Sequence, residues 1–186
     1  LPKIDLLIGG SPCQGFSFAG KQLNFEDERS RLFFEFVRLI EECKPKYFLL
    51  ENVKMKKEYQ DIISSYLGVE PIKINSALVS AQNRERLYWT NIPNVGQPED
   101  KGILLKDILE SGNSESSGEC GIKTFNENNI CHHIANATNI KGNESIKRVY
   151  AETGKSPTLT TMQGGHREPK ILLENIKPSV AKNIAD

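Results

Sequence analysis

An α/β fold, with a parallel sheet covered by helices, is predicted for the first half of the chain from two observations. Short apolar runs alternate along the sequence with segments whose apolar residues recur at helical spacing. Each apolar run ends in glycine or in polar residues, as strands that lead into loops do. The order strand, helix, strand, helix, strand is typical of a parallel sheet, whose functional residues gather at the carboxyl ends of the strands.

The first strand is predicted at Lys3–Ile8, where an apolar run leads into Gly9-Gly10. A helix is expected to begin at Ser30, because apolar residues then recur every three or four positions, and to end at Lys44-Pro45. A second buried strand is predicted at Tyr47–Leu50.

A second amphipathic helix is predicted around Tyr59–Leu67, with Gly68 as its C-cap. A strand at Ile72–Leu78 and an apolar segment at Arg86–Ile92 follow. The strand at Ile72–Leu78 completes the strand, helix, strand, helix, strand order of the predicted sheet.

The character of the sequence changes after Pro93, so we expect two domains, residues 1–95 and residues 96–186. The stretch Glu110–Gly121 is rich in small residues and is expected to be flexible. In the remainder we predict strands at Pro157–Thr161 and Lys170–Leu173, a turn at Gly164-Gly165, and a helix at Lys177–Ala185.

Composition excludes several classes of protein. The chain has 186 residues, of which 38% are hydrophobic, and 24 Lys and Arg balance 24 Asp and Glu. A folded core is therefore expected, whereas no apolar stretch is long enough for a membrane span. The zero net charge neither requires nor excludes nucleic acid, because a local basic groove is what matters.

The first residues and the four cysteines indicate in which cellular compartment the protein is expected. The chain begins Leu1-Pro2 without a Met or a basic leader, so we expect it to begin inside a longer polypeptide and to carry no signal peptide. Without a sign of secretion, the cysteines are expected to be reduced, in a cytoplasmic protein. A zinc site is not expected, because Cys120 and Cys131-His132-His133 lack a second paired-ligand motif.

Cys13 is the first candidate for chemistry. It lies in the string GGSPCQGFS, on a loop at the end of a predicted strand. Backbone amides and solvent can reach a thiol there, which is the environment of a reactive thiolate. The alternative, a small buried hydrophobic residue, is the commoner role of cysteine, but the flanking glycines and Pro12 argue against it.

Glu51 and two arginines are the other candidates. Glu51 closes an apolar strand at the same predicted sheet edge, where a partly desolvated carboxyl group can donate a proton to a bound base. Arg84 and Arg86 alternate in QNRER, so an extended segment would direct both to one face. The alternatives are a surface or helix-terminal charge for Glu51, and an exposed charge cluster for the arginines.

Three strings together resemble the DNA cytosine-5 methyltransferases. GGSPCQGFS at 9–17, ENV at 51–53 and QNRER at 82–86 are similar to the nucleophile, glutamate and Gln-x-Arg-x-Arg motifs of that family, in its order. The resemblance implies a partial Rossmann-like class I methyltransferase sheet with a small, mostly β target-recognition domain. A bacterial or phage restriction-modification setting is implied too.

The resemblance also implies a role for each motif residue. Cys13 would add to carbon 6 of cytosine, which makes carbon 5 nucleophilic, while Glu51 would protonate ring nitrogen 3. Arg86 would donate to the 2-oxygen, and Arg84 would hold the loop or a phosphate. Because these atoms are inaccessible in a stacked duplex, the cytosine must be flipped out.

The methyl donor implied is S-adenosylmethionine, near Pro12. The glycine-rich loop and the acidic residues that bind it in the family are not visible in the sequence, so we expect most of its site to be missing. The implied partner is double-stranded DNA. Residues expected to contact DNA are Gln14, Ser17, Gln82, Thr158, Thr160, Gln163, Gly164, Gly165 and His166.

Two other interpretations remain open. The chain could be a catalytically inactive, DNA-binding remnant that retains the motifs. A thiol-dependent hydrolase is less favoured, because none of the three histidines lies in a motif with Cys13. For the segment from Thr158 to His166, an ordinary β-hairpin with a polar turn is the less favoured alternative.

Overall fold

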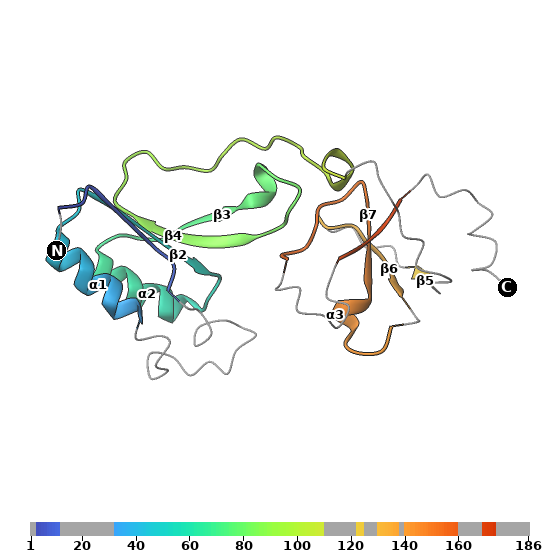
Figure 1. Cartoon of the computed structure of the whole chain (residues 1–186), viewed down its shortest axis with the longest axis horizontal. Helices are drawn as coiled ribbons and strands as arrows, with labels where there is room; N and C mark the ends of the chain where they lie inside the picture. Colours follow the sequence, from blue (N-terminus) through green and yellow to red (C-terminus); the bar gives the residue numbers. More distant parts are fainter. Residues whose placement is uncertain are drawn as a thin grey trace. The chain divides into compact units, whose positions relative to one another are not determined.

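Two compact units make up the chain in the computed structural model, which describes residues 3–11, 32–109, 122–124, 130–137, 140–159 and 169–173. The first unit comprises Leu1–Asn75 and Glu85–Gln97, and the second comprises Ser76–Arg84 and Pro98–Asp186. Each contains one four-stranded sheet (Figure 1). The predicted division at residue 95 was contiguous, whereas here the short segment Ser76–Arg84 groups with the second unit.

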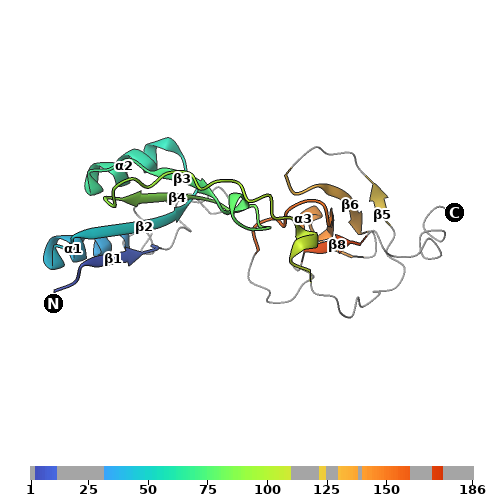
Figure 2. The same cartoon turned by 90° about the horizontal axis from the view of Figure 1, so that it is seen from above.

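The sheet of the first unit is mixed. Its strands are ordered β1-β2-β4-β3, with the bounds β1 Leu6–Gly9, β2 Tyr47–Val53, β3 Ile72–Asn75 and β4 Glu85–Thr90 (Figure 2). β1 pairs parallel with β2, but β4 runs antiparallel to both of its neighbours. The three strands predicted to be parallel, β1, β2 and β3, do run in one direction, whereas β4 lies between β2 and β3 and runs the opposite way. The connection Ser76–Arg84 is too short for a crossover helix, so β4 can only return beside β3 in the opposite direction.

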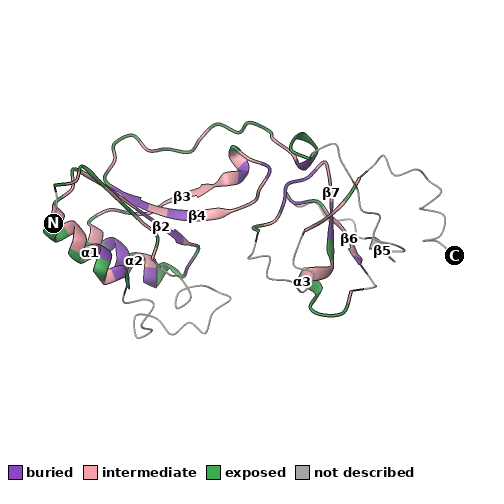
Figure 3. Ribbon diagram, viewed as in Figure 1, coloured by how far each residue is buried: buried purple, intermediate pink, exposed green. Residues whose placement is uncertain are grey.

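Helices α1 (Leu32–Cys43) and α2 (Lys57–Leu67) pack on one face of this sheet (Figure 1). The alternation of strand side chains explains the contact, because every second residue of β2 is buried. The buried residues of the two helices and of β2 and β4 form one core, coloured purple in Figure 3. Its members are Phe33, Phe36, Phe48, Leu50, Met55, Tyr59, Ile63, Leu87 and Trp89.

The opposite face of the sheet is more open. Leu7 packs against the core, whereas its neighbours Leu6 and Ile8 are 46% and 65% exposed on the other side. The same alternation puts Glu51 of β2 and Arg86 of β4 on this open face, since Leu50 and Leu87 face the helices.

The second unit is mostly β. Strands β5 (Ile122–Thr124), β6 (His133–Ala137) and β7 (Arg148–Ala151) are antiparallel, and β8 (Lys170–Leu172) pairs parallel with β7. The short helix α3 (Glu144–Lys147) leads directly into β7. Two single 3-10 turns, η2 (Ser76–Leu78) and η3 (Leu105–Asp107), complete its described elements.

Several predicted boundaries can be compared with these elements. The helix ending at Gly68 is confirmed, because Gly68 adopts the left-handed conformation at φ 70° and its N–H donates to Ser64 O at 2.8 Å. The strand predicted at Ile72–Leu78 stops at Asn75 and becomes η2, and the second strand runs on past Leu50 to Val53.

The strand predicted at Pro157–Thr161 is wrong over residues 157–159, which are irregular. Ser156 makes only an isolated bridge, to Gln82, and Pro157 lacks the N–H that would extend a ladder. Strand β8 agrees with its prediction to within one residue. The predicted helix start at Ser30, the Gly164-Gly165 turn and the helix at 177–185 lie outside the described residues. Over the described residues, no helix is long and apolar enough to cross a membrane.

The core contains one buried polar contact that offers a test of packing. The indole Nε1–H of Trp89 donates to Ser64 Oγ at 3.0 Å, and both side chains are buried. Ser64→Ala leaves that N–H without its acceptor, so we expect a loss of about 1–3 kcal/mol in the free energy of unfolding. Trp89 is the only tryptophan of the chain, so its fluorescence in a urea titration follows this core.

Ser65→Ala is the matched control, because Ser65 is exposed on the same helix and its hydroxyl donates only to Ile62 O. We expect a change within about 0.5 kcal/mol for this variant. Equal losses for the two alanine variants would contradict a specific role for the buried contact.

Candidate functional site

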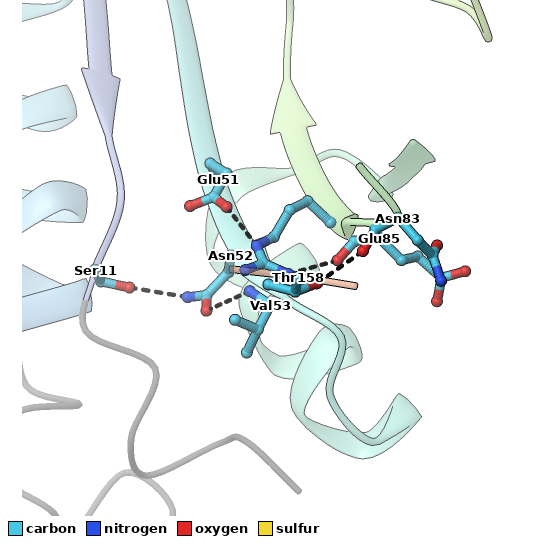
Figure 4. Close-up of polar contacts among 8 residues, drawn as sticks. Ser11, Glu51, Asn52, Val53, Asn83, Glu85 and Thr158 are labelled. Carbon is cyan, nitrogen blue, oxygen red and sulfur yellow. Dashed lines mark hydrogen bonds and ion pairs between the residues drawn. The ribbon is translucent and has the colours of Figure 1, made fainter. Parts of the chain in front are cut away.

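Glu51 and Arg86 form an ion pair on the open face of the first sheet. In the antiparallel pairing of β2 with β4, Glu51 lies opposite Tyr88 and Val53 lies opposite Arg86, so the two charged residues are diagonal neighbours. Arg86 Nε is 2.9 Å from Glu51 Oε1 (Figure 4). The Arg86 side chain is 13% exposed and that of Glu51 is 34% exposed, so solvent reaches the pair mainly through the carboxylate.

The guanidinium of Arg86 has donor capacity left. Its Nη1 donates to the carbonyl of Glu85 at 2.8 Å. Its Nε–H is buried and has no aligned hydrogen-bond acceptor, although Glu51 Oε1 is close by. The contact is thus an ion pair rather than a linear hydrogen bond, and a buried donor of this kind favours an acceptor from a ligand.

The segment after β1 lies against the same carboxylate. A Cβ placed on Gly10 would be 3.4 Å from Glu51 Oε2, so the glycine lets the backbone approach Glu51 closely. One residue later, Ser11 Oγ accepts a hydrogen bond of 3.1 Å from Asn52 Nδ2 (Figure 4). The parallel pairing of β1 with β2 thus brings the start of the GGSPC segment beside Glu51, as expected for neighbouring strands.

Asn52 is a site residue that the sequence analysis did not single out. It is 1% exposed, and its Oδ1 also accepts from the N–H of Val53 at 2.8 Å. The signal was available, because Asn52 shares its face of the strand with Phe48 and Leu50. A polar residue at a buried strand position needs hydrogen-bond partners, and here one of them is Ser11.

Gln82 and Arg84 belong to the connection Ser76–Arg84, which groups with the second unit. Gln82 forms a parallel bridge with Ser156, and its carbonyl accepts from Ser76 Oγ at 2.9 Å. The carbonyl of Arg84 accepts from Ser76 N–H at 3.1 Å. Of the two arginines in the QNRER string, only Arg86 belongs to the strand β4, so the expectation that both arginines share one strand face is not met within a regular strand.

Thr158 is exposed and belongs to the same unit as Gln82. Its Oγ1 donates to the carbonyl of Asn83 at 2.8 Å (Figure 4). Thr158 and Asn83 also line an open cavity of about 510 Å³ in that unit. Two expected DNA contacts, Gln82 and Thr158, are thus placed on adjoining segments. The cavity is lined by Asn83, Ile130, Cys131, His133, Asn136, Glu144, Arg148, Tyr150, Pro157 and Thr158.

Cys131 is packed rather than arranged as a metal ligand. It is 8% exposed, burial raises the pKa of its thiol, and its Sγ is 3.6 Å from Asn83 Nδ2, which acts as the donor. No group of three or more His, Cys, Asp or Glu side chains suited to a metal occurs among the described residues. Cys120 lies outside them.

The other predicted site residues also lie outside the described part of the chain. Their expected roles therefore stay predictions. They are Pro12, Cys13, Gln14, Ser17, Thr160, Gln163, Gly164, Gly165 and His166.

Comparison with known proteins identifies the family. The family model described as C-5 cytosine-specific DNA methylase matches residues 1–182. This match extends over nearly the whole chain, so the chain belongs to the C-5 cytosine-specific DNA methylase family.

Individual relatives come from bacteria and their phages. The orphan methyltransferase M.Rho11sI of Bacillus phage rho11s is 26% identical over 289 positions, which cover 95% of this chain and 58% of the relative. The orphan methyltransferase M.SPRI of Bacillus phage SPR is 38% identical over 140 residues, 68% of this chain and 32% of the relative. The type II methyltransferase M1.ScrFI of Lactococcus lactis subsp. cremoris is 46% identical over 99 residues, 47% and 25% respectively. The chain thus spans between 25% and 58% of the length of these relatives.

Family membership implies S-adenosylmethionine as the methyl donor, and the two glycines at the end of β1 do not offer an open cradle for it. A Cβ on Gly9, the last residue of β1, would be 2.6 Å from the Phe36 ring, so that side chain fills the space beside Gly9. A Cβ on Gly10 would be in ordinary van der Waals contact with Glu51 Oε2 at 3.4 Å.

Asn52 offers a test of how this site is held together. Replacing this buried side chain with alanine removes two hydrogen bonds and leaves the partly buried Ser11 hydroxyl and Val53 N–H without these partners, so Asn52→Ala should lower the free energy of unfolding by about 2–3 kcal/mol. Fluorescence-detected urea unfolding measures the change. Asn91→Ala is the control, because Asn91 also makes two hydrogen bonds, to Phe48 N–H and Lys46 O, but is exposed. A loss of about 1 kcal/mol or less is expected there, and similar losses for both variants would contradict the buried role of Asn52.

Proposed function

We propose that this chain is part of a DNA cytosine-5 methyltransferase, with the first unit belonging to a Rossmann-like class I methyltransferase sheet and the second to a target-recognition domain. The observation that carries the proposal is the Glu51–Arg86 ion pair beside Gly10, three residues before Cys13. A carboxyl group and a guanidinium donor on neighbouring strands, with a cysteine three residues after Gly10 in the sequence, suit the ring of a cytosine. Membership of the family supports the same reaction.

Cys13 and Glu51 would act together on the flipped base. The Cys13 thiolate forms a bond to carbon 6 while ring nitrogen 3 takes a proton from Glu51, so that the electrons of the 5,6 double bond move into the ring without leaving a negative charge. Carbon 5 thereby becomes nucleophilic. After carbon 5 is methylated, its proton is lost to solvent and the sulfur departs from carbon 6 as the Cys13 thiolate. Ring nitrogen 3 then returns its proton to the Glu51 carboxylate, which restores the aromatic ring.

Arg86 would hold the base through its 2-oxygen. The buried Nε–H, which has no aligned acceptor, supports this role because it is a donor next to the acid that contacts nitrogen 3. Cytosine presents its 2-oxygen beside nitrogen 3, so adjacent donors match adjacent ring positions. Arg84, in the neighbouring connection, would hold that loop or a phosphate.

S-adenosylmethionine supplies the methyl group when bound, and Pro12 is the residue of this chain proposed to lie near it. The described residues do not form its site, so none of them is proposed to act on the methyl donor. What the chain's own residues contribute is attack, proton transfer and orientation of the base.

Duplex DNA is the proposed substrate, in the cytoplasm of a bacterial or phage-infected cell. A flipped cytosine identifies only itself, so the neighbouring bases must be read elsewhere. The residues proposed for DNA contact in this chain are Gln14, Ser17, Gln82, Thr158, Thr160, Gln163, Gly164, Gly165 and His166.

The first test of this function is Cys13→Ser in the full-length protein. A hydroxyl is a far weaker nucleophile than a thiolate at neutral pH but has nearly the same size. Methyl transfer from labelled S-adenosylmethionine should therefore fall to below about 1% of wild type while duplex affinity changes by less than about tenfold. Residual turnover well above that level would remove Cys13 from the reaction.

Trapping with a duplex that contains 5-fluorocytosine separates the alternatives. Fluorine on carbon 5 cannot leave as a proton does, so a methyltransferase should remain bonded to the DNA through Cys13. A DNA-binding remnant should bind the duplex without a covalent product. A thiol hydrolase should do neither.

The second functional test is Glu51→Gln, which keeps the shape of the side chain but cannot donate the proton. Single-turnover methylation should slow by at least ~10²-fold, the usual range for loss of a general acid. Glu85→Gln is the matched control, because the Glu85 carboxylate pairs with Lys54 and Lys73 instead of with Arg86. If Glu51→Gln altered duplex affinity alone, Glu51 would be a DNA-positioning residue and its proposed role in proton transfer would be wrong.

A further inference from the structure

Lys155 is buried in the second unit, which is unusual for a lysine. It is 6% exposed, and all three donors of its ammonium are directed at backbone carbonyls. The acceptors are Ala77 O at 2.6 Å, Ile103 O at 2.7 Å and Ser80 O at 3.2 Å. A buried charge is tolerated only when its hydrogen bonds are all made, so the three carbonyls must converge on this point.

Two of those carbonyls belong to the connection Ser76–Arg84, which carries Gln82 and Arg84. The segment that follows Lys155 binds the same connection further along. Ser156 N–H donates to Ala81 O at 2.7 Å, and Asn83 N–H donates back to Ser156 O at 2.7 Å. Lys155, Ser156 and Thr158 thus fix the connection at successive points between Ala77 and Asn83.

The backbone of Lys155 is itself held in place. Its N–H donates to Ile130 O at 3.1 Å. The preceding residue, Gly154, packs directly on the backbone of Cys131, where an added Cβ would be only 2.8 Å from the Cys131 carbonyl oxygen. The ammonium therefore extends from a fixed backbone, and the connection is the part that must adjust to it.

We propose that Lys155 is a positioning residue, whose ammonium locks the Gln82–Arg84 connection to the segment that begins the DNA-reading region at Thr158. The consequence is that Gln82 and Thr158 act as one rigid DNA-contact surface. This inference rests on the proposed methyltransferase function and adds to it a residue that does not contact the substrate.

Lys155→Met tests the inference in the full-length protein, because methionine keeps much of the length and none of the donors. Hydrogen exchange should become faster at the amides of Asn83 and Ser156, whose bonds join the two segments. Single-turnover methylation, expressed per site that 5-fluorocytosine DNA can trap, should slow by about tenfold or more. Counting only trapped sites removes the effect of a smaller folded fraction.

Lys155→Arg retains a charged donor and should restore most of the rate and of the amide protection. Lys106→Met is the control, because Lys106 is exposed in the same unit and should leave both readouts unchanged. Should Lys155→Met fail to fold, Ser76→Ala serves instead. It removes only the hydroxyl that holds Gln82 O, and it should give a smaller change in the same direction.

The outcomes are distinct. Unchanged hydrogen exchange at Asn83 and Ser156 in Lys155→Met, or in Ser76→Ala where that variant replaces it, would contradict the proposed link between the two segments. Faster exchange with a wild-type rate per trapped site would show that Lys155 is structural only, which also overturns the proposal. If the wild-type protein neither methylates nor is trapped, the proposed function fails, and the role in positioning the reaction fails with it. The hydrogen-exchange data then still decide whether Lys155 holds the two segments together.

Discussion

The reversed direction of β4 is the constraint on which the arrangement of the first unit depends. β4 lies between β2 and β3 and runs antiparallel to both, so its residues meet those of β2 in an order that a parallel strand would not produce. One of its faces supplies Leu87 and Trp89 to the core beneath the helices. The other face carries Arg86 to the diagonal position beside Glu51.

The same strand explains how the two charged residues can lie beside an apolar core without entering it. Their side chains leave the sheet on the face opposite α1 and α2, where Leu6 and Ile8 are also exposed. Asn52 is different, since it points to the core side and satisfies its amide through Ser11 and Val53. A polar group on the buried face therefore links the segment after β1 to β2, while Glu51 and Arg86 lie on the open face.

Much of this arrangement could be predicted from the sequence, and the failures have physical causes. Periodicity located α1, α2 and the first strands because their buried faces follow the helical or the two-residue repeat. The local pattern of β4 does not show its direction, because an apolar strand reads the same whichever way it runs, but the short connection Ser76–Arg84 leaves no room for a crossover helix and so indicates an antiparallel return. The predicted strand at 157–161 is absent over residues 157–159, because Pro157 has no N–H to extend a ladder, and this obstacle is visible in the sequence.

For the site, the sequence alone pointed to Glu51 and Arg86, and the structure places them in contact. It did not point to Lys155, because no local pattern distinguishes a buried lysine from the many exposed ones. The three carbonyls that surround its ammonium belong to residues that lie 52 to 78 positions from Lys155 in the sequence, and only the folded backbone brings them to it. Asn52 falls between these cases, since its position on an alternating strand marks it as buried.

The many hydrogen bonds along Ser76–Arg84 also bear on how this sequence can evolve. The connection is held at Ala77, Ser80, Ala81 and Asn83 by the consecutive residues Lys155 and Ser156, and it lies between the paired strands β3 and β4. Side chains such as that of Val79, which is 40% exposed, are available for replacement. An inserted or deleted residue, in contrast, would shift every later carbonyl out of register with its donor. Descendants of this sequence should therefore vary this connection in composition while keeping its length, and should accommodate length changes elsewhere.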